Sequence, residues 1–282
     1  MFYVILIIII IIIVLFIFLS VYRKWYYYYY LKNKLFPLQI SDIKLEDDIT
    51  KEDNYNNIIQ ILPRKPTNNE IIFLLKYKKF MDLPNVYSMC DDYKINQMKN
   101  IIEQVFKRNI PGSFVETGVW KGGMAMWMKC IMKYHKQNRN LWLFDTFDNF
   151  PEPTHTKDKT IHNITNLLFE KGPTVYDVIE NFKKFGLLDD KVHFIVGNFS
   201  KTLEHTDPEE IAILRLDSDY YDSTLLVLEL YYHKVVTGGY IIIDDYNNYH
   251  VACKNAVDYF RKKHKIESPI YDINRESVYW IK

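Results

Sequence analysis

The sequence predicts an α/β fold built on a mainly parallel sheet, and three observations support this class. Short apolar runs alternate with longer segments whose apolar residues recur at helical spacing. The clearest unit is 211–246, in which two apolar runs flank a helical segment in the manner of a right-handed strand–helix–strand crossover. The chain closes on two short runs, 270–273 and 278–281, which are separated by turn residues and predict an antiparallel hairpin.

Composition limits the kinds of protein that this chain can be. Its 282 residues suffice for one large α/β domain with appendages, and its net charge of +1 gives no general field for binding nucleic acid. The three cysteines, Cys90, Cys130 and Cys253, are odd in number and far apart. They indicate neither a disulfide framework nor a zinc site, and a reducing compartment suits them better. The sequence leaves the oligomeric state open.

The N-terminal segment predicts one transmembrane helix. Residues 2–19 form an unbroken apolar run, and about 20 such residues span the roughly 30 Å of a bilayer core. Basic residues follow the run from Arg23 onward, whereas a cleaved signal peptide would carry them before it. We therefore predict a transmembrane anchor over 1–22 in the lipid bilayer, in a single-pass membrane protein whose remainder is cytoplasmic. Residues 23–83, broken by prolines, are predicted to be a juxtamembrane tether, and 84–282 the folded domain.

The folded domain begins with a predicted helix, a strand and a glycine turn. Helical spacing over 94–108 is followed by an apolar run that ends at Glu116 and Thr117. Gly118 and Gly122 then lead into a second helical pattern. A strand that ends on an acid and turns through glycine into a helix is an arrangement that cradles ligands, although tight packing also demands glycine. The spacing differs from the G-x-G-x-x-G of a dinucleotide loop, which argues against NAD.

Two more predicted strands extend the sheet. The first ends on Asp145, where Rossmann-like sheets place an acid that accepts ribose hydroxyls, with a helix or turn cap as an equal alternative. An amphipathic pattern over 174–185 then predicts a helix, and the run 192–197 the next strand. Asn198 and Ser200 follow this strand, where they are placed to meet an adenine ring or an amide.

Both apolar runs of 211–246 end on paired acids, which are Asp217, Asp219, Asp244 and Asp245. Because parallel sheets bind ligands at the carboxyl ends of their strands, we expect the four carboxylates to gather on one edge. Two carboxylates about 4 Å apart repel by roughly 4 kcal/mol at an effective dielectric near 20. A hard ion such as Mg²⁺, which prefers oxygen ligands, would relieve this repulsion. The alternative is that the acids simply end strands in solvent.

Further helical segments complete the alternation. Within 211–246, the Ser-Thr pair at 223–224 is expected to cap a helix that the glycine pair at 238–239 stops. Another helical pattern, over 251–264, precedes the closing hairpin. Strands that alternate with helices and end in an antiparallel pair are the order expected of a Rossmann-like, seven-stranded sheet of the class I, S-adenosylmethionine-dependent methyltransferases.

Several ordered motifs resemble the macrocin O-methyltransferase family. They are the segments 114–123, 145–147, 150–151, 214–219, 244–246 and 278–280. The similarity covers 84–282, which would be the methyltransferase domain, and leaves out the anchor and the tether. The resemblance implies S-adenosylmethionine as methyl donor, Mg²⁺ as helper, and a hydroxyl of a sugar or glycoconjugate as acceptor.

The resemblance also implies roles for individual residues. The metal ligands would be Asp217, Asp244 and Asp245. The donor site would contain Glu116, Thr117, Gly118 and Asp145, to which we add Gly122, Asn198 and Ser200. The departures from the family pattern are Ser218, where glycine is usual, and Tyr221 and Asp222 in the following turn.

These roles define a mechanism. Methyl transfer from a sulfonium is an in-line displacement, so the protein must supply alignment and a nucleophilic oxygen. Coordination to Mg²⁺ would lower the pKa of the hydroxyl, and either Asp217 or Asp219 would take its proton as base. Two alternatives remain: an O-methyltransferase of a catechol-like or other small vicinal diol, and a catalytically degenerate, membrane-bound scaffold. The clustered acids argue against the scaffold.

The predicted crowding of carboxylates also bears on stability. If like charges repel in the metal-free protein, removing one of them should relieve the repulsion. The variant Asp244→Asn is therefore expected to melt no lower than the metal-free wild type.

Overall fold

The computed structural model describes residues 87–156, 158–159, 162, 172–247 and 252–282. The predicted anchor (1–22) and tether (23–83) lie outside these residues, so both stay predictions. Within the described ranges, no helix combines the length and the apolar character needed to cross a bilayer.

A single seven-stranded sheet forms the centre of the described part of the chain, in the order β3-β2-β1-β4-β5-β7-β6. The strands are β1 (Ser113–Thr117), β2 (Leu141–Asp145), β3 (Val192–Val196), β4 (Ile211–Leu216), β5 (Val235–Ile243), β6 (Tyr271–Asp272) and β7 (Val278–Ile281). β1 to β5 pair in parallel, whereas β7 runs antiparallel to both β5 and β6. The predicted seven-stranded α/β sheet with a C-terminal hairpin is confirmed.

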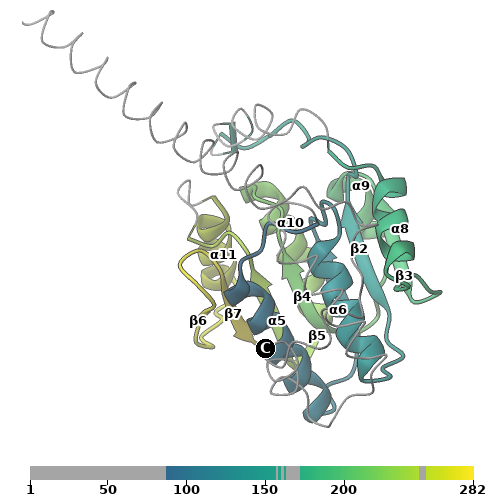
Figure 1. Ribbon diagram of the computed structural model, residues 1–282. Helices are drawn as coiled ribbons and strands as arrows, with labels where there is room; N and C mark the ends of the chain where they lie inside the picture. Colours follow the sequence, from purple (N-terminus) through teal and green to yellow (C-terminus); the bar gives the residue numbers. More distant parts are fainter. Residues whose placement is uncertain (1–86, 157, 160–161, 163–171, 248–251) are drawn as a thin grey trace, which may run out of the picture. The chain divides into compact units, whose positions relative to one another are not determined.

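Helices cover both faces of this sheet (Figure 1). They are α5 (Asp92–Lys107), α6 (Gly123–Tyr134), α8 (Val175–Lys184), α9 (Phe199–Thr202), α10 (Tyr221–Tyr231) and α11 (Ala252–Lys263). In Figure 1, α5 and α6 lie in front of the sheet and α10 and α11 behind it. The strand order reverses between β1 and β4, and open α/β sheets bind their ligands at such a reversal.

The face of the sheet that α10 and α11 cover holds an apolar core. Alternate residues of the central strands, such as Leu214 and Ile241, pack against Val227 of α10 and Phe260 of α11. These side chains are almost fully buried, and each contributes about 1.5–3 kcal/mol through removal from water. This packing holds β4 and β5 rigidly beside each other, so their carboxyl ends are fixed relative to one another.

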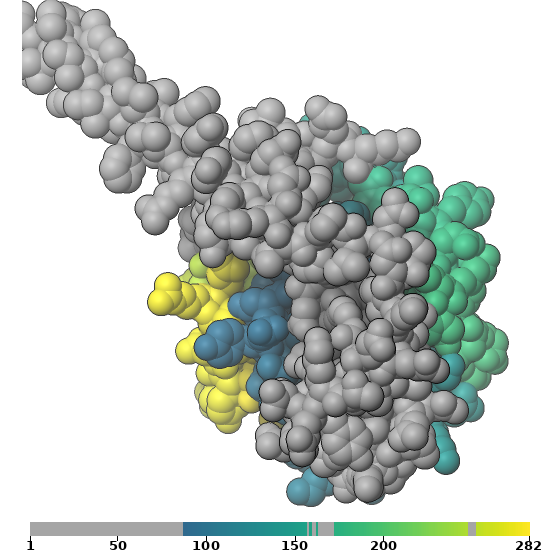
Figure 2. All heavy atoms as spheres, viewed as in Figure 1, coloured from purple at the N-terminus to yellow at the C-terminus, as the bar shows by residue number. Residues whose placement is uncertain are grey.

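The start of α5 is fixed against the C-terminal hairpin. Figure 2 shows this helix (blue) next to the C-terminal segment (yellow). Asp91 accepts a hydrogen bond from the backbone N–H of Lys94 at 2.9 Å and caps the helix, while the Asn274 amide donates to its other oxygen at 2.9 Å. An N-terminal cap of this kind contributes about 1 kcal/mol. It places Lys94 in the first turn, beside the carboxyl ends of the strands.

Two boundaries of the crossover helix differ from the prediction. The pair at 223–224 was expected to cap α10, but the helix begins at Tyr221 and a carboxylate distant in sequence binds its first turn. Asp158 accepts from the backbone N–H of Tyr221 at 2.7 Å. The glycine pair at 238–239 does not stop the helix, which ends at Tyr231.

The glycines instead lie inside β5. Ile211 pairs with Val235 and Ile213 with Tyr240, so β5 carries extra residues between these two pairs. Gly238 has a φ of 83°, a left-handed conformation that glycine adopts without strain. The glycine pair therefore lies at an irregularity of a strand. From the sequence alone, this role of glycine cannot be told apart from the role of ending a helix.

Candidate active site

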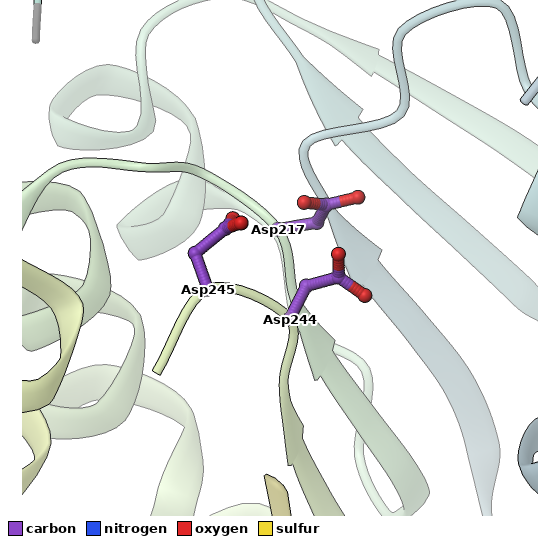
Figure 3. Close-up of side chains that lie close together, drawn as sticks. All are labelled: Asp217, Asp244 and Asp245. Carbon is purple, nitrogen blue, oxygen red and sulfur yellow. The ribbon is translucent and has the colours of Figure 1, made fainter. Parts of the chain in front are cut away.

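Three carboxylates meet where β4 and β5 end. Asp217 follows β4, and Asp244 and Asp245 follow β5; the two strands pair in parallel up to Leu216 and Ile243. One oxygen of each of the three carboxylates lies within 4.8 Å of the others. Figure 3 shows the three side chains gathered in one space beyond the strand ends. The expected gathering of acids at this edge is confirmed for these three residues.

The fourth aspartate of the predicted group, Asp219, lies in the turn after β4. Its φ is 59°, a conformation that few non-glycine residues adopt, and its side chain lines the cavity described below. Burial, and then the charges of Asp217 and Asp244, raises the pKa of Asp219 to about 7. Asp219 therefore lies beside the cluster of three without belonging to it.

A buried arginine holds the cluster from within the sheet. Arg215 of β4 is 1% exposed. Its Nη1 donates to Glu116 Oε1 at 2.5 Å, and its Nη2 donates to Asp244 Oδ1 at 2.5 Å and lies 2.8 Å from Asp217 Oδ2. One guanidinium thus joins the ends of β1, β4 and β5. Sequence reasoning missed Arg215, although a charged residue inside an apolar strand run was a usable signal, because a buried charge requires partners.

A lysine reaches the same cluster from α5. Lys94 Nζ lies 2.5 Å from Asp244 Oδ2, and its side chain is 10% exposed. Both oxygens of Asp244 are therefore engaged by cations, one by Arg215 and the other by Lys94. The sequence held no local signal for this contact, because 150 positions separate the two residues.

The cations divide the aspartates into two kinds. Burial would raise the pKa of Asp244, but Arg215 and Lys94 outweigh it and hold that pKa below its usual range. For Asp245, burial and the charges of Asp219, Asp217 and Asp244 raise the pKa well above the usual range. Repulsion therefore acts on Asp245. The expectation that Asp244→Asn melts no lower than wild type assumed repulsion at Asp244, and that reason is wrong.

A cavity opens at the carboxyl ends of β1, β2 and β4. It encloses about 970 Å³ of space, a volume that includes its open mouth. Its polar lining includes Asp145, Asn198, Asp217, Ser218 and Asp219. Its apolar walls include Met89, Trp120, Phe150, Pro151, Phe199 and Tyr220. Part of the predicted donor site and both predicted bases therefore face one space.

The predicted donor residues do not all line this cavity. Gly118, Asp145 and Asn198 belong to the lining, whereas Glu116, Thr117, Gly122 and Ser200 lie outside it. Glu116 is buried under Arg215, burial raises its pKa to about 8 against the effect of that arginine, and its Oε2 has no partner among the described residues.

The other residues outside the lining have local structural contacts. Gly122 precedes α6 with a φ of 83°, and a Cβ there would lie 2.8 Å from Val178. Thr117 donates its hydroxyl to the Arg215 carbonyl at 3.4 Å, and Ser200 lies in the first turn of α9, where its backbone N–H donates to Asn198. Their contacts in this structure are with the fold, so a part in donor binding stays a prediction for them.

Asp145 ties the glycine turn to the sheet. Its Oδ2 accepts from the backbone N–H groups of Val119 at 2.6 Å and Trp120 at 3.0 Å, and its Oδ1 accepts from that of Phe147 at 2.9 Å. In the same turn, a Cβ on Gly118 would lie 1.7 Å from the Asp217 carbonyl oxygen. Both alternatives of the sequence analysis therefore have support here, because Asp145 caps a turn and also lines the cavity.

Known proteins resemble this chain over most of its length. The family described as Macrocin-O-methyltransferase (TylF) matches residues 46–282, a range that begins inside the predicted tether. Mycinamicin III 3''-O-methyltransferase of Micromonospora griseorubida is 35% identical over 205 residues, 71% of this chain and 80% of that protein. The 8-demethyl-8-(2,3-dimethoxy-alpha-L-rhamnosyl)-tetracenomycin-C 4'-O-methyltransferase of Streptomyces olivaceus is 34% identical over 206 residues, 71% of this chain and 77% of that protein.

A solved structure agrees with these sequence matches. The O-methyltransferase NovP superposes with a TM-score of 0.66 and 35% identity, covering 70% of this chain and 83% of that one.

Proposed function

The chain belongs to the macrocin O-methyltransferase family and is an S-adenosylmethionine-dependent O-methyltransferase, and from this premise we propose that it methylates a sugar hydroxyl of a glycosylated small molecule with the help of Mg²⁺. The observation that carries the proposal is the convergence of Asp217, Asp244 and Asp245 beside a cavity whose lining includes Asp145 and Asn198. The rhamnosyl group in the name of the Streptomyces olivaceus relative supports a sugar as acceptor.

The side chains at the strand ends fit a magnesium ion. Three carboxylates from adjacent strands form an all-oxygen donor set, which is the chemistry that Mg²⁺ prefers. Asp217, Asp244 and Asp245 would hold the ion. Mg²⁺ bound there would lower the pKa of an acceptor hydroxyl and orient its oxygen. Asp217 also lines the cavity, so an ion held by the cluster would lie next to a molecule bound inside.

The donor fits the side of the cavity formed by β1, β2 and α9. Gly118 exposes backbone there, and Asn198 and Asp145 supply polar atoms. Asp145 accepts hydrogen bonds from the backbone N–H groups of Val119, Trp120 and Phe147 and, at 3.3 Å, from the Thr146 hydroxyl, so a ribose hydroxyl bound here would take the place of the long Thr146 contact. In this position Asp145 serves the donor both by contact and by holding the turn in place.

The variant Asp145→Ala is expected to weaken donor binding by about 1–3 kcal/mol, the usual loss for hydrogen bonds to a charged group. Calorimetric titration with S-adenosylhomocysteine measures this directly. Asp190→Ala, at an exposed position away from the cavity, is the matched control and should bind as wild type. Unchanged affinity in the Asp145 variant would remove this residue from the donor site.

Asp219 is the better placed of the two predicted bases. Asp217 has one oxygen 2.8 Å from Arg215 Nη2 and belongs to the cluster of three. Asp219 lies in the same turn, lines the cavity and stands outside that cluster. In the proposed step, Asp219 accepts the proton of the acceptor hydroxyl while the hydroxyl oxygen forms its bond to the methyl carbon and the sulfur–methyl bond breaks.

Acceptor choice decides between the proposal and its alternatives. Full-length protein, isotopically labelled donor and Mg²⁺ would be incubated with rhamnosylated small molecules and, separately, with catechols. We expect label in the sugar of a glycoside, located by mass spectrometry of the released sugar. Labelled catechol without labelled glycoside would favour the small-diol alternative. Donor binding without transfer to any acceptor would favour the scaffold.

We also propose that residues 1–22 anchor the protein in a lipid bilayer, with the methyltransferase domain in the cytoplasm. The support is the uncharged apolar run and the basic residues that follow it. Deleting 1–22 is expected to move the protein from the membrane pellet to the supernatant with donor binding intact. A truncated protein that still pellets with lipid would contradict the anchor. Protease added to sealed vesicles of known orientation tests the cytoplasmic placement separately.

A further inference from the structure

Lys94 brings a positive charge into the acidic site from outside the sheet. Its helix, α5, is fixed at that end by the Asp91 cap and the Asn274 contact. The Lys94 ammonium lies 2.5 Å from Asp244 Oδ2, and its side chain is 10% exposed. At the strand ends, the Asp244 carboxylate is thus already paired with a cation, Lys94, which reaches it from α5.

Carboxyl groups outnumber cations around this contact. The carboxyl groups gathered here are Glu116, Asp217, Asp219, Asp244 and Asp245, and in the described part of the chain Arg215 and Lys94 form ion pairs with them. Arg215 is built into the strand and reaches three of the acids at once. Lys94 joins Asp244 from a helix, at the end of a flexible four-carbon stem.

We propose that Lys94 is a positioning residue that holds Asp244 in the metal-free protein and sets the affinity of the site for its metal ion. The proposal rests on the proposed use of Mg²⁺ at this site. An ion held by Asp244 shares that carboxylate with the Lys94 ammonium, so the two positive charges lie a few ångströms apart and repel each other. Lys94 therefore orients a ligand for the metal and at the same time weakens metal binding.

A structural ion pair alone would behave differently. In that case a neutral side chain at position 94 would lower the stability of the protein and leave Mg²⁺ binding unchanged or weaker. If Lys94 opposes the ion, the neutral side chain strengthens Mg²⁺ binding whatever its effect on stability. The direction of the change in metal affinity therefore separates the two roles.

Calorimetric titration of MgCl₂ into the metal-free, full-length protein tests this. Lys94→Met and Lys94→Gln are expected to bind Mg²⁺ at least tenfold more tightly than wild type, a difference of about 1.4 kcal/mol. Lys94→Arg, which keeps the charge, should bind within about twofold of wild type. The matched control is Lys99→Met on the same helix, whose ion pair with Glu103 lies apart from the cluster and which should leave Mg²⁺ affinity unchanged.

The outcomes separate this inference from the metal proposal. Wild-type binding of Mg²⁺ with no tighter binding in the neutral variants overturns the role of Lys94 and leaves the metal site standing. Absence of binding in wild type and in both neutral variants overturns both. Should the methionine variant fail to fold, the glutamine variant decides, because its amide can still donate to Asp244.

Discussion

Asp244→Asn is expected to lower the free energy of unfolding of the metal-free protein by about 3 kcal/mol, whereas Asp245→Asn should leave it unchanged or raise it. Asp244 is 5% exposed and binds both Arg215 and Lys94, so its loss leaves buried positive charge without its partner. Breaking a buried ion pair costs about 3–5 kcal/mol, and Arg215 keeps Glu116 and Asp217, which favours the lower end.

Asp245 is the matched control, because it is adjacent in sequence and belongs to the same cluster. Its pKa is raised well above the usual range by burial and by neighbouring acids, so the site disfavours a charge there and accepts an uncharged amide. Thermal melts in excess chelator measure the difference, with about 3 kcal/mol corresponding to roughly 6–12 °C for a domain of this size. Equal melting temperatures for the two variants would contradict the assignment of Arg215 and Lys94 as partners of Asp244.

Asp219→Asn is expected to reduce kcat by about 10²–10⁴-fold, the range for loss of a general base. The amide cannot accept the acceptor's proton, while the proposed metal ligands and the donor side of the cavity stay in place. Binding of S-adenosylhomocysteine and of Mg²⁺ should therefore remain near wild type. Quench-flow or single-turnover measurement with saturating donor isolates the chemical step from binding and release.

Asp217→Asn is the comparison variant for this experiment. It should lose both turnover and Mg²⁺ affinity, since Asp217 is one of the proposed ligands. If Asp219→Asn turns over at the wild-type rate, Asp219 is not the base. If Asp217→Asn loses turnover and keeps full Mg²⁺ affinity, the proton acceptor is Asp217, the alternative that the sequence analysis left open.

The acidic edge was predictable because it follows from strand direction alone. Asp217 and Asp244 each come directly after an apolar run, and the carboxyl ends of parallel strands share one edge. The order of strands and helices likewise fixed the sheet and its closing hairpin. Those inferences need only local patterns and the rules for connecting them.

The remaining features depend on contacts between distant segments. The cap of α10 comes from Asp158, 63 positions before Tyr221, so the local Ser-Thr pair at 223–224 misled the prediction. The partner of Asp244 on α5 lies 150 positions away. Gly118 fits a ligand turn by sequence, yet its lack of a Cβ is required by the Asp217 carbonyl beside it. Local sequence patterns do not predict contacts of this kind between distant segments.

Arg215 corrects the physical picture of the site. Counting acids alone predicted a crowded cluster whose repulsion an ion would relieve, whereas the structure supplies a guanidinium and an ammonium among the carboxylates. The metal-free cluster is therefore partly balanced. The proposed role of the ion is to activate an acceptor hydroxyl. Arg215 and Lys94, and not the ion, are proposed to stabilise the carboxylates in the fold.

The most direct test of metal-assisted methyl transfer is turnover of the wild-type enzyme on a glycoside acceptor in excess chelator, followed by titration with Mg²⁺, with the melting temperature recorded under each condition. We predict no turnover in chelator, its return with Mg²⁺, and a rise in melting temperature that tracks Mg²⁺ concentration by mass action. Full activity in chelator, with no Mg²⁺-dependent shift in melting, would contradict a metal at Asp217, Asp244 and Asp245.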